Sequence, residues 1–89
     1  MRLSETSVTR RNAVAVKAAV LEAACGGDDV LDFSGVTAVD STSVSILMSW
    51  VRAVTAAGRR PCVRGVPDKM RSLMRLYGVE RLLEPAFEA

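Results

Sequence analysis

The sequence contains no histidine, and this absence narrows the functions it can serve. Histidine is the commonest general base and the commonest metal ligand, because its side chain titrates near neutral pH. The chain also has no metal-ligand cluster and no glycine-rich loop of the kind that cradles phosphate. We therefore predict that the protein is not an enzyme, and we expect no catalytic residue, metal or cofactor.

Cysteines, aromatic residues and long apolar runs are also scarce. Cys25 and Cys62 are too few and too far apart for a disulfide scaffold or a zinc site, so we expect both to be buried or half-buried. With one Trp, one Tyr and two Phe, the core must consist mainly of Val, Leu, Ile, Met and Ala. Neither a signal peptide nor a bilayer-spanning run is visible, so we expect a cytoplasmic protein.

The length of 89 residues fits one domain, residues 1–89, and the charge is unevenly distributed along it. Residues 1–49 carry four basic and six acidic side chains, whereas residues 50–89 carry eight basic and four acidic ones. This asymmetry predicts a basic face on the C-terminal half. Aromatic residues are not interleaved with the basic ones, so we expect solvent or an acidic protein partner there rather than nucleic acid.

The first part of the chain predicts an arm and a helix. Residues 2–7 carry a weak signal for a short strand or an arm. Apolar residues then recur at helical spacing over residues 10–25, which predicts the first helix. Thr9 is a candidate N-cap, and Gly26-Gly27 is a typical helix end. Two neighbouring apolar stripes run along this helix: Val14, Ala18 and Leu21, and beside them Val16, Val20 and Ala23.

The middle of the chain predicts two short extended runs and a second helix. Residues 30–33 and 36–39 are rich in strand-forming residues, and a helix then runs from Asp40 to about Gly58. Trp50 lies one residue before a stripe position, so it is either a core residue or, if exposed, an interface anchor. We expect it in the core. The apolar stripe of this helix consists of Val44, Leu47, Met48, Val51 and Val54.

The last part adds a strand and a third helix. Residues 61–66 predict a strand. Pro67-Asp68 is typical of a helix start, and Gly78 of the end of that helix. The predicted buried stripe of this helix is Met70, Leu73, Met74 and Tyr77. Strands that alternate with helices predict an α/β fold, with a small mixed sheet packed against helices.

Three segments resemble, in order, the STAS domain family (sulphate transporters and anti-sigma-factor antagonists). They are residues 30–36 (VLDFSGV), residues 39–44 (VDSTSV) and residues 64–79 (RGVPDKMRSLMRLYGV), and the resemblance extends over about residues 10–83. It implies the STAS-like fold of anti-sigma-factor antagonists, with the first strand missing or shortened. Ser43 stands where the family usually has glycine.

Two stretches, residues 50–52 and 76–79, are most similar to the small, MlaB-like STAS subunit of Mla-type phospholipid-transport ABC systems. This implies a non-enzymatic module that binds and supports the ATPase subunit, peripheral to the inner membrane through that partner. The alternative is an anti-sigma-factor antagonist regulated by phosphorylation of Ser41 by its partner kinase. A homodimer is a further alternative, because a missing first strand leaves a sheet edge that a second copy can cover.

The candidate functional loop is Asp40-Ser41-Thr42-Ser43, at the start of the second helix. Backbone N–H groups are unpaired at a helix start, so a carboxylate or hydroxyl can cap them. Capping is the simplest interpretation of these residues. The functional interpretation makes the loop a partner contact, with Ser41 as a phosphorylation switch that gains roughly −1.5 to −2 charges.

A second candidate surface is the set of cations Lys69, Arg71 and Arg75 on the third helix. Arg71 and Arg75 are four residues apart, so we expect them to share one exposed side. A solvated face is the simplest interpretation, and a rim for an acidic partner is the functional one.

Overall fold

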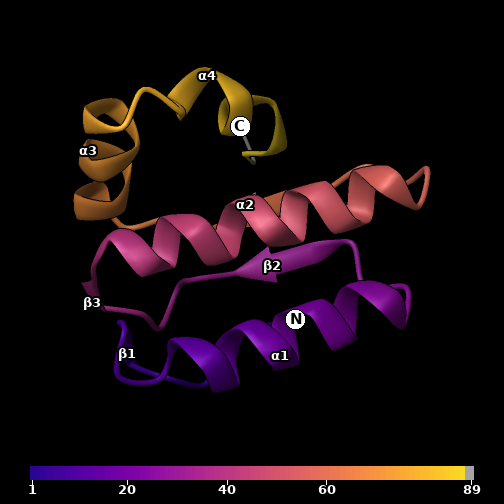
Figure 1. Cartoon of the computed structure of the whole chain (residues 1–89), viewed down its shortest axis with the longest axis horizontal. Helices are drawn as coiled ribbons and strands as arrows, with labels where there is room; N and C mark the ends of the chain where they lie inside the picture. The colour runs from indigo at the N-terminus through magenta and orange to yellow at the C-terminus, as the bar shows by residue number, and fades with distance from the viewer. Residues whose placement is uncertain (88–89) are drawn as a thin grey trace.

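The computed structural model describes residues 1–87 and has an α/β architecture in which short strands alternate with helices (Figure 1). The predicted α/β class is therefore confirmed. The strands are β1 (Ser7–Val8), β2 (Val30–Asp32), β3 (Ala38–Val39) and β4 (Cys62–Arg64). The helices are α1 (Ala13–Cys25), α2 (Ser41–Ala56), α3 (Asp68–Leu76) and the short α4 (Glu80–Leu83), which a 3-10 turn η1 (Glu84–Ala86) follows.

Strand pairing is parallel at every ladder and bridge among the described residues, which is more uniform than the mixed sheet we expected. β1 pairs with β3 and β2 pairs with β4, while single bridges join Arg2 to Asp32 and Val63 to Phe87. Parallel neighbours require a crossover connection, and helices provide it here. As a result, α1 and α2 lie side by side and run in the same direction (Figure 1).

The core lies where α1, α2 and α3 meet the strands. The predicted stripe of α2 is confirmed at Val44, Leu47 and Val54, which are buried, whereas Met48 and Val51 are half-buried. The predicted placement of Trp50 is also confirmed, since its side chain is 0% exposed. Within residues 1–87, no helix is long and apolar enough to cross a membrane.

The start of α1 differs from the prediction. The helix begins at Ala13, and the N-cap position is taken by Asn12 rather than Thr9. The backbone N–H of Thr9 instead donates to Oδ1 of Asn12 at 3.0 Å. The turn before α1 is therefore closed by an asparagine side chain, which accepts local backbone hydrogen bonds well.

The buried face of α1 is the second of the two predicted stripes. Val16 and Val20 are buried, whereas Val14 of the first stripe is 85% exposed. Both stripes are apolar, so only packing against α2 decides which of them faces inward. Cys25 is exposed in the last turn of α1, so the prediction that it is buried or half-buried is wrong, whereas Cys62 is half-buried as predicted.

The predicted stripe of the third helix ends earlier than expected. Met70 and Met74 are buried and Leu73 is half-buried, but Tyr77 is 51% exposed. α3 ends at Leu76 and Tyr77 is its C-cap residue, so the last position of the predicted stripe lies at the end of the helix, where solvent reaches the ring.

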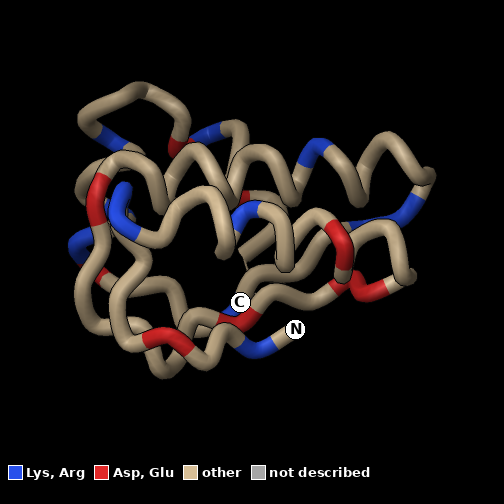
Figure 2. Tube along the Cα trace, turned by 60° about the horizontal axis from the view of Figure 1, so that its bottom comes forward, with Lys and Arg blue, Asp and Glu red and all other residues tan. Residues whose placement is uncertain are grey.

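The basic residues of the C-terminal half do not form one continuous face. Lysines and arginines are spread over several parts of the chain (Figure 2), and some of them have partners. Arg59 forms an ion pair with Asp29 at 2.5 Å, and Arg75 pairs with Glu80 at 2.9 Å. Neighbouring carboxylates therefore neutralise part of the positive charge of the C-terminal half.

The turn after β2 makes a close contact with Gly65 at the end of β4. Asp32 Oδ1 accepts the backbone N–H of Ser34 at 2.8 Å and fixes this turn. Gly65 has φ +65°, and a Cβ added to it would lie 2.6 Å from Ser34 Oγ and 2.9 Å from Ser34 Cα. Glycine is needed here both for its conformation and for the space.

We expect Gly65→Ala to destabilise the fold by about 2–4 kcal/mol, because left-handed strain and a steric clash add together. Gly58→Ala is the matched control: Gly58 has φ +78° but no neighbouring atom within 4 Å of an added Cβ, so strain alone should cost about 1 kcal/mol. Urea unfolding followed by the fluorescence of Trp50 measures both changes. Equal losses in the two variants would contradict the close contact.

Candidate functional site

Residues 40–43 lie at the start of α2, directly after β3, as the sequence predicts. Asp40 is the N-cap, and its Oδ1 accepts the backbone N–H of Thr42 at 2.9 Å and also the Thr42 hydroxyl. In return, the Ser43 hydroxyl accepts the backbone N–H of Asp40 at 3.4 Å, which completes a capping box. The capping interpretation of this loop is therefore correct for Asp40.

Asp40 also reaches a second segment of the chain. Its Oδ2 accepts the backbone N–H of Arg10 at 3.0 Å, in the turn that leads into α1. One carboxylate therefore connects the starts of α1 and α2. The pKa of Asp40 lies below its ordinary value of 3.8, chiefly because of the hydrogen bond from the Thr42 hydroxyl. Burial acts in the opposite direction, and the backbone N–H groups of Arg10, Thr42 and Ser43 lower the pKa further.

Ser43 is a buried structural residue. Its side chain is 0% exposed, and its hydroxyl donates to the backbone carbonyl of Val8 in β1. No residue other than glycine in residues 1–87 has a positive φ, so the serine at the family's glycine position needs no left-handed backbone. Ser43 ties α2 to β1 and lies beneath the surface that a partner can touch.

Ser41, by contrast, is exposed at the first position of α2. It stands at one end of a shallow groove of about 250 Å³, which lies between α2 and the connection from α3 to α4. We call this the Ser41 groove. Its lining consists of Ser41, Val44, Ser45, Met48, Tyr77 and Val79.

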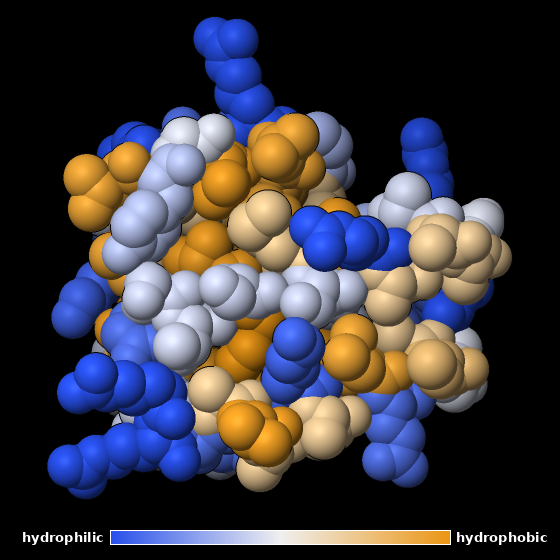
Figure 3. All heavy atoms as spheres, in the orientation of Figure 1, coloured by the Kyte–Doolittle hydropathy of each residue, from blue (hydrophilic) through white to orange (hydrophobic). Residues whose placement is uncertain are grey.

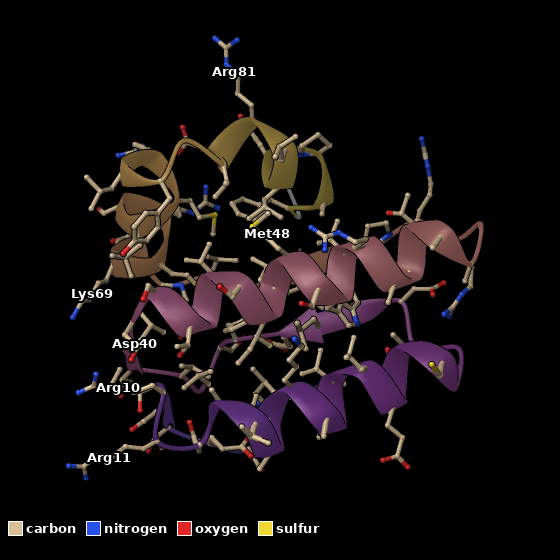
Figure 4. The ribbon with its side chains drawn as sticks, viewed as in Figure 1. Arg10, Arg11, Asp40, Met48, Lys69 and Arg81 are labelled. Carbon is tan, nitrogen blue, oxygen red and sulfur yellow. The ribbon has the colours of Figure 1, made fainter. Side chains whose placement is uncertain are left out.

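Cationic side chains lie at the same end of the molecule as Asp40. Figure 4 shows Arg10, Arg11 and Lys69 pointing outward there. Lys69 is one of the three cations predicted on the third helix. Arg10 and Arg11 were not singled out from the sequence, because nothing local indicates that residues 10 and 40 meet.

The other two predicted cations have contacts of their own and do not share one free side. The guanidinium of Arg71 stacks over the ring of Phe87, 4.6 Å from its centroid, and the side chain is half-buried. Arg75 is engaged by Glu80. These contacts brace α3 against the segment that follows it.

A family model described as "Mlab, STAS domain" matches residues 2–84. The chain belongs to the MlaB-like STAS family. The resemblance predicted from the sequence is thereby confirmed. STAS domains are in general protein-interaction or regulatory modules and are generally non-catalytic. A comparison with curated proteins gave no match to this chain.

The geometry of this STAS domain suits binding. An exposed hydroxyl, a partly apolar groove and outward-pointing cations come together at the start of α2. Among residues 1–87, no group of three or more His, Cys, Asp or Glu side chains is placed to hold a metal ion. What the described surface at Ser41 presents to a partner is an exposed hydroxyl, the groove beside it and the N-terminus of α2.

We expect Asp40→Ala to destabilise the STAS domain by about 1 kcal/mol at neutral pH, through loss of the cap. Because the folded-state pKa of Asp40 is lowered, its ionised form contributes stability at pH values above 3.8, and that contribution is lost as the pH falls through the lower folded-state value. Urea unfolding from pH 7 to pH 3 should show the difference between wild type and variant shrinking in acid. A difference independent of pH would contradict a role for the charge.

We also expect Ser43→Ala to cost about 1–2 kcal/mol, because it removes the buried hydroxyl that donates to the Val8 carbonyl. Ser41→Ala is the matched control, since its side chain is exposed and its loss should change the free energy of unfolding by less than about 0.5 kcal/mol. Thermal and urea unfolding of the two variants compare them directly. The reverse order would show that Ser41, not Ser43, supports the fold.

Proposed function

We propose that this chain is a single-domain, non-enzymatic STAS subunit that binds and supports the ATPase of an Mla-type phospholipid-transport ABC system. The observation that carries the proposal is the match to the MlaB-like STAS family over residues 2–84. Its place is cytoplasmic, peripheral to the inner membrane through the ATPase.

The surface that we assign to the ATPase is centred on Ser41. Asp40 and Thr42 hold the first turn of α2 in place, so the Ser41 hydroxyl is presented in a fixed position. The Ser41 groove offers apolar contacts at Met48 and Tyr77 beside it. Lys69 adds a positive charge at the same end of the molecule (Figure 4), where an acidic part of the partner can pair with it.

One observation favours a second candidate, an anti-sigma-factor antagonist switched by phosphorylation of Ser41. The Ser41 hydroxyl is exposed at the start of a helix, where a kinase can reach it. A phosphate there adds charge beside Asp40, whose pKa already favours the ionised form. The two candidates share the surface and differ in the partner.

Affinity purification of the tagged chain from its native host separates the candidates by the identity of the partner. We expect an ABC ATPase to copurify with the wild type and with Ser41→Ala. Ser41→Glu should reduce recovery of the ATPase at least tenfold, because a carboxylate replaces a hydroxyl inside the interface, a change of the size measured for central interface residues.

The control is Ala19→Glu, which adds the same charge on the exposed side of α1 and should leave recovery unchanged. Recovery of an anti-sigma-factor kinase in place of the ATPase would replace the proposal by its alternative. If Ser41→Glu retained full ATPase binding in a folded protein, the Ser41 surface would be excluded as the interface.

A further inference from the structure

A second groove lies along the C-terminal half of α2, beyond the Ser41 groove. Two adjoining depressions of about 440 and 550 Å³ have Val51, Thr55 and Leu82 in common, so they form one continuous hollow, which we call the α2–α4 groove. In Figure 3, hydrophobic atoms gather between α2 and α4. Its apolar lining comes from Met48, Val51, Leu82, Leu83, Pro85 and Phe87.

The apolar lining is open to solvent. Leu82 belongs to both depressions and is 67% exposed, while Met48, Val51 and Phe87 are half-buried. Covering apolar surface is worth about 25 cal/mol per Å² removed from water. Contiguous exposed apolar surface with a polar rim is a mark of interaction sites on monomeric proteins.

The charge of the groove has one sign. The charged side chains among its described lining are Arg52 and Arg60, and no Asp or Glu lines it within residues 1–87. Neither arginine has an ion-pair or hydrogen-bond partner among the described residues, although Arg59 next to Arg60 and Arg75 on α3 both have carboxylate partners. The groove therefore combines an apolar floor with two guanidinium groups that lack counter-charges.

We propose that the α2–α4 groove binds an acidic amphipathic helix of a protein partner. The groove lies between helical elements, the setting in which an amphipathic helix places its apolar face. Apolar side chains of the incoming helix cover Leu82 and Met48, and carboxylates on its flanks pair with Arg52 and Arg60. This site goes beyond the proposed function, because it lies apart from Ser41 and does not depend on whether the partner is an ATPase.

The test uses the full chain and a fluorescently labelled synthetic helix of about 16 residues, with Leu at positions i, i+3, i+4 and i+7 and Glu on both flanks. We expect binding with a dissociation constant of about 100 µM or tighter, weakening as salt is raised. The same peptide with Lys in place of Glu, and a scrambled peptide of equal composition, should bind at least tenfold more weakly.

Matched variants locate the site on the chain. Leu82→Ala should weaken binding of the acidic peptide about tenfold, whereas Leu76→Ala, which truncates a leucine that is 75% exposed but does not line the groove, should not. Arg52→Glu combined with Arg60→Glu should weaken binding of the acidic peptide and strengthen binding of the Lys peptide. Lys17→Glu combined with Arg81→Glu makes the same charge change at exposed side chains that do not line the groove, of which Arg81 points away from it (Figure 4), and should have no effect.

Each other outcome overturns the proposal. Equal affinity for the Glu and Lys peptides, or no binding of the Glu peptide at 1 mM, removes the charge argument. Self-association of the chain that Leu82→Ala abolishes assigns the groove to a second copy, and binding of phosphatidylglycerol vesicles that depends on Arg52 and Arg60 assigns it to lipid. Ser41→Glu should leave peptide affinity unchanged, so failure at this groove is distinguishable from failure of the proposed function.

Discussion

The carboxylate of Asp40 is the contact on which the candidate functional end of the molecule depends. One oxygen closes the first turn of α2 through Thr42, and the other receives the backbone N–H of Arg10 before α1. Helix starts leave N–H groups that need acceptors. Asp40 accepts one of these at α2 and, with its other oxygen, an N–H in the turn that precedes α1. Because the start of α2 and the turn before α1 are held together, the exposed Ser41 and the backbone of Arg10 keep a defined arrangement relative to each other.

The features that local chemistry decides could be predicted from the sequence. The α2 cap at Asp40, the helix start at Pro67 and the burial of Trp50 all follow from turn, capping and periodicity signals within a few residues. The α/β class follows from the alternation of those signals, and the STAS family from the three segments that carry its pattern.

The features that depend on distant neighbours could not be predicted in the same way. Either apolar stripe of α1 can face a core, and only the position of α2 selects Val16 and leaves Val14 in solvent. Arg71 was expected on an open face because the sequence does not show that Phe87 returns to lie under it. Ser43 looks like its neighbours in the loop, yet its hydroxyl is buried because β1, 35 residues earlier, passes beneath it.

Met48 links two surfaces that are otherwise separate. Met48 lines both the Ser41 groove and the α2–α4 groove. Among the described residues, it is the one side chain that the two linings have in common. A methionine side chain is unbranched and adopts several rotamers at low cost. A ligand that fixes its rotamer from one side changes what the other side presents, so two occupants of this domain would have affinities that are thermodynamically coupled rather than independent.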